Sequence, residues 1–80
     1  MTETTARFRC FSVTYQDVGL GEMACDVRLW PVHRGSPENA RFFYATPAGE
    51  INLQLVSQAT ASQFVPGREY YVLFRPAGQP

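Results

Sequence analysis

Few side chains in this sequence could carry out catalysis. The chain has one histidine, His33, in a polar loop beside Arg34, and no lysine, so a nucleophilic hydroxyl or thiol has a single candidate base. Asp26 could form a carboxylate pair with Glu50 or Glu69, but their spacing puts no two acids on one face of an element. We therefore predict that the protein is not an enzyme and has no catalytic residues.

Phosphate and metal sites have equally little support. Gly19 and Gly21 lie in a connection between two expected strands, without the lysine and the following helix of a phosphate-binding loop. Cys10 and Cys25 are the only thiols and, with His33, are too few for a four-ligand zinc site. We expect no metal and no cofactor. A disulfide is conceivable if the two cysteines lie on neighbouring strands, but buried free thiols are the favoured interpretation.

Arginine and aromatic side chains are better candidates, and they point to binding. The seven basic residues are all arginine, which suits carboxylate, phosphate and aromatic faces, although a GC-rich coding bias explains the lack of lysine more simply. Six Phe, four Tyr and one Trp cannot all fit inside so small a core, and exposed aromatic residues beside arginine are typical of protein-binding surfaces. The candidate binding surface consists of Trp30, Arg41, Phe43, Tyr71, Leu73 and Arg75.

One domain must position these residues, because 80 residues leave room for no more. We assign residues 1–80 to that domain, with loose tails at 1–6 and 77–80. Apolar and polar residues alternate along most of the chain, which predicts strands. The expected strands are residues 8–15, 23–30, 40–45, 51–55 and 69–74. From Ser57 to Val65 the pattern changes and predicts a short helix with Ser57 as its N-cap.

The alternation assigns the strand faces unevenly. The first strand has no clear inward face, because Phe8 and Cys10 share one face and Phe11 and Val13 share the other. The second strand is clear, since its odd-numbered residues from Met23 to Leu29 are apolar and point inward.

Residues 40–45 and 51–55 are expected to pair as an antiparallel hairpin. The Thr46–Gly49 segment has the composition of the tight turn that would join them. In that hairpin Phe42 and Tyr44 fall on the core face, and Arg41 and Phe43 fall on the other.

These elements predict a mainly β domain. The expected architecture is a small five-stranded antiparallel barrel or sandwich with one short helix before the last strand. Closure would remove the exposed edges of so small a sheet. Five strands with one helix are OB-like, but an OB-fold has its helix between the third and fourth strands, so an SH3-like barrel stays open as an alternative.

Four motifs mark the chain: F-x-C at Phe8, E-N-x-x-F at Glu38, T-P-x-G at Thr46 and F-x-x-G-x-E-Y-Y-V-x-F at Phe64. With these motifs the segment from Phe8 to Ala77 resembles a family of small uncharacterised proteins encoded by tailed bacteriophages and prophages. Leu73 departs from the family pattern, which has a polar residue before the last phenylalanine, and this change would add apolar surface to the final strand. The resemblance implies a phage origin and a size class, without a mechanism.

The net charge and the hydropathy of the sequence limit the kinds of partner that we expect. The formal net charge is zero, which disfavours a nucleic-acid binder because such proteins need positive charge to displace counterions. No run of about 18 apolar residues is present, and the N-terminal residues lack the order of a signal peptide. We expect a protein of the host bacterial cytoplasm that does not contact the membrane.

The first functional hypothesis is a non-enzymatic phage accessory protein that acts by protein–protein contact. It would bind or inhibit a host factor, or assemble with its own copies, as in a homodimer formed through Tyr71 and Leu73. One alternative is an OB-like single-stranded nucleic-acid-binding protein that stacks bases on exposed aromatic residues. A second alternative is a minor virion component of the capsid or tail.

Overall fold

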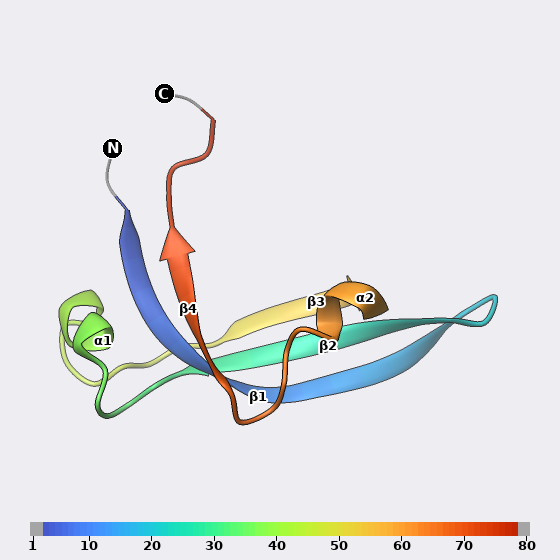
Figure 1. Cartoon of the computed structure of the whole chain (residues 1–80), viewed down its shortest axis with the longest axis horizontal. Helices are drawn as coiled ribbons and strands as arrows, with labels where there is room; N and C mark the ends of the chain where they lie inside the picture. The colour runs from blue at the N-terminus through green and yellow to red at the C-terminus, as the bar shows by residue number, and fades with distance from the viewer. Residues whose placement is uncertain (1–2, 79–80) are drawn as a thin grey trace.

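One antiparallel sheet forms most of the structure, a computed structural model that describes residues 3–78 (Figure 1). The elements in chain order are β1 (Thr4–Gly19), β2 (Glu22–Pro31), α1 (Pro37–Phe42), β3 (Ile51–Ser57), α2 (Gln58–Ala61) and β4 (Glu69–Phe74). The mainly β class is therefore confirmed. The predicted short helix before the last strand is α2, and Ser57 caps it by accepting the Thr60 N–H.

The strands lie in the order β3-β2-β1-β4, which is the order of a Greek key. β1 is long enough to serve two neighbours, since Phe8–Gly19 pair with β2 and Thr4–Arg9 pair with β4. The described residues thus form an open sheet of four strands, and the predicted five-stranded barrel is not confirmed.

The predicted strand at residues 40–45 is wrong, because the chain forms α1 there. Ser36 caps this helix by accepting the Asn39 N–H at 3.2 Å, and Pro37 occupies its first turn. The predicted hairpin is wrong for the same reason, since β3 pairs with β2 instead.

The aromatic residues at the end of α1 also differ from the expectation. Phe43 is half-buried against the core, whereas Phe42 is half-exposed and Tyr44 is fully exposed. Strand alternation predicts the reverse. The reason is that α1 ends at Phe42 and the chain becomes extended at Phe43, so these residues do not belong to one strand with alternating faces.

The N-terminal tail is shorter than expected. Thr4–Ala6 pair with β4, and Ala6 is completely buried. This part of the predicted tail at 1–6 therefore belongs to the sheet. Residues 1–2 and 79–80 of the predicted tails lie outside the described residues, and residues 77–78 have no helix or strand.

β1 and β2 are joined by a two-residue loop, Leu20 and Gly21, which forms the projecting tip of the sheet (Figure 1). Their φ angles are 55° and 73°, and two positive values are what a type I′ hairpin turn requires. Glycine adopts this region freely, but leucine is strained there. Leu20 is fully exposed, so no contact offsets this strain.

A β-bulge at Phe11 divides β1. Cys10 pairs with Leu29, whereas the next residue of β1 to find a partner is Ser12, so Phe11 is an extra residue in the ladder. The bulge shifts the alternation by one position, and Cys10 and Val13 consequently lie on the same face. This shift explains why alternation alone leaves two possible inward faces for β1.

The core lies on one face of the sheet, which we call the inner face. Its buried residues are Ala6, Phe8, Cys10, Cys25, Val27, Leu29 and Ala61. α2 and the segment that leads to β4 cover this face, and the Tyr70 hydroxyl holds that segment by donating to the Gln63 carbonyl and accepting the Val65 N–H. The prediction that both cysteines are buried is confirmed, and both are free thiols.

The molecule is flat. Its extents are 44 × 34 × 17 Å and its radius of gyration is 14.7 Å, against about 11.6 Å for a compact domain of this length. Its accessible surface is 5860 Å². A compact monomer of 9.0 kDa exposes about 4,850 Å², so this chain exposes about 1,000 Å² more. The excess is the expected consequence of a single sheet with only a partial second layer.

Candidate interaction surface

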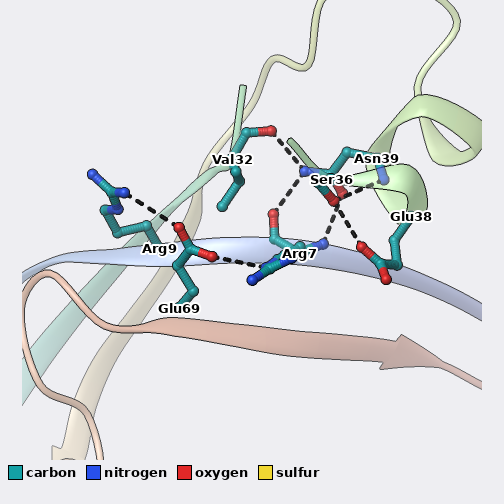
Figure 2. Close-up of polar contacts among 7 residues, drawn as sticks. All are labelled: Arg7, Arg9, Val32, Ser36, Glu38, Asn39 and Glu69. Atoms are coloured by element: carbon teal, nitrogen blue, oxygen red, sulfur yellow. Dashed lines mark hydrogen bonds and ion pairs between the residues drawn. The ribbon is translucent and has the colours of Figure 1, made fainter. Parts of the chain in front are cut away.

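Asn39 of α1 takes the place of a missing strand beside β1. β2 ends at Pro31, and the backbone of Arg7 needs partners beyond that point. Asn39 is 2% exposed; its Oδ1 accepts the Arg7 N–H at 2.7 Å, and its Nδ2 donates to the carbonyl oxygens of Arg7 and Val32 at 2.8 Å each (Figure 2). Because all of these bonds are made within the fold, Asn39 positions β1 and is not free to bind a ligand.

Glu69 lies on the opposite side of β1 from Asn39 and joins two arginines (Figure 2). Arg7 Nε is 2.8 Å from Glu69 Oε1, and Arg9 Nη2 is 3.2 Å from Glu69 Oε2. Arg9 and Glu69 are directly opposite across the β1–β4 ladder. These contacts fix a charged centre on the face away from the core, which we call the outer face.

Two large side chains of β4 continue this centre. Arg7 Cζ lies 5.6 Å from the centroid of the Tyr71 ring, a distance suited to a cation–π contact. Leu73 follows on the same face, opposite Thr5. Tyr71 is 59% exposed and Leu73 is 52% exposed. The outer face of β4 therefore presents aromatic and aliphatic surface next to fixed charges.

An aromatic pair extends the same surface onto β2. The rings of Phe11 and Trp30 stack with centroids 3.9 Å apart and an angle of 11° between their planes. Trp30 lies opposite Arg9, and its Nε1 donates to Glu50 Oε2 at 2.8 Å. The pair borders a hollow of about 360 Å³, which Arg9 and His33 also line.

We call this assembly the outer patch. It consists of Arg7, Arg9, Phe11, Trp30, Glu69, Tyr71 and Leu73. Three of the six residues proposed from the sequence, Trp30, Tyr71 and Leu73, lie together in it. The patch crosses β4, β1 and β2, so the antiparallel pairing of these strands determines its layout.

The other three sequence candidates lie elsewhere. Phe43 packs against the core and is not on the outer face. Arg41 is exposed at the end of α1, where it lines a hollow of about 480 Å³ with Glu3 and Phe42. Arg75 follows β4 and forms an ion pair with Glu3 at 2.6 Å.

Sequence reasoning missed four members of the outer patch. Phe11 could not be assigned to a face because of the bulge. Arg7 lies between the tail expected at 1–6 and the strand expected at 8–15, and Arg9 and Glu69 acquire their roles only when β1 pairs with β4. The available signal was the odd-numbered spacing of Arg7, Arg9 and Phe11, which is that of one strand face.

Two titratable groups have a shifted pKa, and neither group forms part of the outer patch. Burial raises the pKa of the Cys10 thiol, while a hydrogen bond with the backbone of Ser12 lowers it by a smaller amount. The second group is the Glu38 carboxylate at the start of α1. Hydrogen bonds from the Glu38 backbone N–H and from the Ser36 hydroxyl lower its pKa. Within residues 3–78 no group of three or more His, Cys, Asp and Glu side chains could hold a metal ion.

Comparisons with known proteins give no relatives for this surface. No protein-family model matches the chain, and no curated protein and no solved structure matches it either. In the part of the chain that the structure describes, no helix has the length and apolar character needed to cross a bilayer. The interpretation of the outer patch therefore rests on its own chemistry.

Proposed function

We propose that this protein is a small, non-enzymatic phage accessory protein that acts by protein–protein contact in the cytoplasm of its bacterial host. The observation that carries the proposal is the excess accessible surface of about 1,000 Å², found together with exposed aromatic residues on a flat sheet. Stable interfaces bury about 800 Å² per partner, so a partner of ordinary size would account for the excess.

The outer patch has the composition of a protein-binding surface. Tyr, Trp and Arg are enriched where binding energy concentrates, and here they adjoin an aliphatic residue, Leu73. The ion pairs of Glu69 hold both arginines in place before any partner arrives. The arginine side chains would then lose little conformational entropy when a partner binds.

Under the same proposal, the predicted closed barrel would form only when a partner is bound. An OB-like or SH3-like barrel needs a fifth strand, and the four strands of residues 3–78 leave the sheet open. A strand from a partner would have to complete it. If this protein were a virion component, packing against the capsid or tail would also cover the sheet. No side chain favours that partner over another.

Capture from a bacterial lysate tests the proposal. The full chain is tagged and compared with Tyr71→Asp, which puts a charge into the outer patch, and with Thr14→Asp, another exposed position, on β1 outside the patch. We expect wild type and Thr14→Asp to retain the same protein or to self-associate, and Tyr71→Asp to lose it while keeping its circular dichroism spectrum. A folded wild-type chain that stays monomeric and captures nothing would contradict the proposal.

A single-stranded nucleic acid is the second candidate partner. The observation in its favour is the exposed Phe11–Trp30 stack beside Arg9 and His33, because single-strand binders stack bases on such rings. Fluorescence anisotropy of labelled single-stranded DNA at low salt tests it, with Trp30→Leu as the variant that removes one ring. Absence of binding at low salt, where electrostatic attraction is greatest, would exclude this candidate.

A further inference from the structure

We infer that β4 pairs with β4 of a second copy of this chain, in an antiparallel ladder centred on Val72, so that two four-stranded sheets join into one. This inference rests on the proposed function and names the partner and the contact. It concerns the free edge of β4 and the part of the outer patch, Tyr71 and Leu73, that lies beside that edge.

The free edge of β4 is open and has no feature that blocks pairing. Among residues 3–78 no strand or helix lies along the side of β4 that faces away from β1 (Figure 1). Glu69–Phe74 contain no proline, lysine or bulge, which are the usual means of blocking an edge. The other edge, β3, has such a feature, because a bulge places Leu55 at a φ of 57°.

The backbone groups of β4 are oriented for this pairing. The N–H and carbonyl of Arg7 are directed away from β4, toward Asn39 and Val32. In an antiparallel ladder the bonded residues alternate, so Arg7 and Tyr71 form a non-bonded pair. The N–H and carbonyl groups of Tyr71 and Leu73 are therefore directed toward the free edge, where they need a partner or water.

One register makes the edge complementary to itself. With Val72 opposite Val72 of the second copy, Tyr71 lies opposite Leu73, and both pairs of free backbone groups are bonded. Glu69 then lies opposite Arg75 of the second copy, so opposite charges meet at each end of the ladder. A register centred on Tyr71 would instead put Glu69 opposite Leu73 and leave its charge without a cross-strand partner.

The excess exposed area of the chain agrees with the area that binding of a second copy would bury. The chain exposes about 1,000 Å² more than a compact monomer, and a standard interface takes about 800 Å² from each partner. Tyr71, Leu73 and Phe74 are each about half-exposed along this strand. A two-fold dimer covers the same surface on both copies, and a formal net charge of zero leaves no long-range repulsion between them.

Light scattering after size-exclusion chromatography, applied to the full chain, gives the first measurement. We expect a mass about twice the 9.0 kDa of one chain. Leu73→Pro removes an N–H that the inference assigns to the free edge and that β1 does not use, so it should raise the dimer dissociation constant about 100-fold or more. Leu73→Val keeps the N–H and is the matched control, with an expected change of less than about threefold.

Cysteine cross-linking tests the register without relying on the proline variant. Under a mild oxidant we expect Val72→Cys to form a covalent dimer by itself, because the two copies of residue 72 face each other across the two-fold axis. Tyr71→Cys alone should not cross-link, but a mixture with Leu73→Cys should. Wild type is the control for the two native thiols, which are buried.

Two results would overturn the inference. One is a wild-type chain that remains a monomer at all concentrations, and the other is a dimer in which Val72→Cys does not cross-link. The lysate capture distinguishes this failure from that of the proposed function. A monomer that still captures a host protein through Tyr71 excludes only the self-pairing, whereas a monomer that captures nothing excludes both.

Discussion

The two halves of β1 belong to one strand but have different surroundings. The first, Thr4–Cys10, is the enclosed half: β4 lies along one edge, and Asn39 and the end of β2 lie along the other. Its Ala6 and Phe8 are buried. The second, Ser12–Gly19, is the ribbon half, which pairs only with β2 and contains no buried residue.

Apolar composition alone does not explain this difference. The ribbon half also has apolar residues at Val13, Tyr15 and Val18, yet Tyr15 and Val18 are half-exposed. What the enclosed half has in addition is a neighbour on each edge, and Phe43, Phe64 and Tyr70 pack against the core to which it contributes. Burial along a strand is therefore decided by the elements that reach it, and the same apolar pattern without them becomes surface.

The largest expected effect comes from removing Asn39. Asn39→Leu keeps the approximate size but leaves the Arg7 N–H and the Val32 carbonyl buried without their partners, so we expect the free energy of unfolding to fall by about 2–4 kcal/mol. Urea denaturation measures it. Thr14→Ala in the ribbon half is the control and should cost less than about 0.5 kcal/mol. Equal losses at the two positions would contradict the contrast between the halves.

Hydrogen exchange should show the contrast without mutation. Amides of Ala6 and Phe8 are assigned to the β1–β4 ladder beneath a covered face, whereas those of Thr14 and Gln16 lie where β1 has only β2 beside it and its side chains are exposed. We expect the first pair to exchange at least about tenfold more slowly than the second. Similar protection in both halves would mean that β1 opens as a single unit.

Relief of strain at the ribbon tip should give a smaller, stabilising effect. Leu20→Asn replaces a leucine at positive φ by a residue that a type I′ turn favours, and should raise the free energy of unfolding by about 0.5–1 kcal/mol. Leu20→Ala retains the strain and is the control. If both variants are equally stable, the turn conformation does not cause the effect. The enclosed half should show no change in exchange.

The smallest expected effect is a pH dependence from Cys10 in the enclosed half. Burial raises the pKa of this thiol in the folded chain above its unfolded value, so the neutral thiol favours folding below the unfolded value. That contribution is lost as the pH rises through the folded pKa. We expect unfolding free energies of wild type to fall more steeply than those of Cys10→Ala in alkaline urea titrations. Parallel profiles would contradict it.

Sequence alone could predict the parts of this fold that local chemistry determines. The alternation from Met23 to Leu29 and from Glu69 to Phe74 correctly indicates strands β2 and β4, and the Ser57 cap correctly indicates α2. The glycines on either side of Leu20 correctly indicate the hairpin.

The errors arose where a non-local contact decides the structure. A strand was expected at residues 40–45, directly before the Thr46–Gly49 turn, although Ser36 and Pro37 are typical of a helix start. Asn39 is held in that helix by the backbone of β1, more than thirty positions earlier in the chain. The same holds for the outer patch, where Trp30, Tyr71 and Leu73 were identified but their arginine neighbours depend on the β1–β4 pairing.

The 17 Å thickness of the molecule also has a thermodynamic consequence. Unfolding one isolated chain releases little apolar area, because much of that area already faces water, so its heat capacity change and its urea dependence are small for 80 residues. When a partner covers the sheet, unfolding releases the interface as well, and both quantities increase. The steepness of the urea denaturation curve then measures the fraction of chains that have a bound partner. This fraction rises with protein concentration.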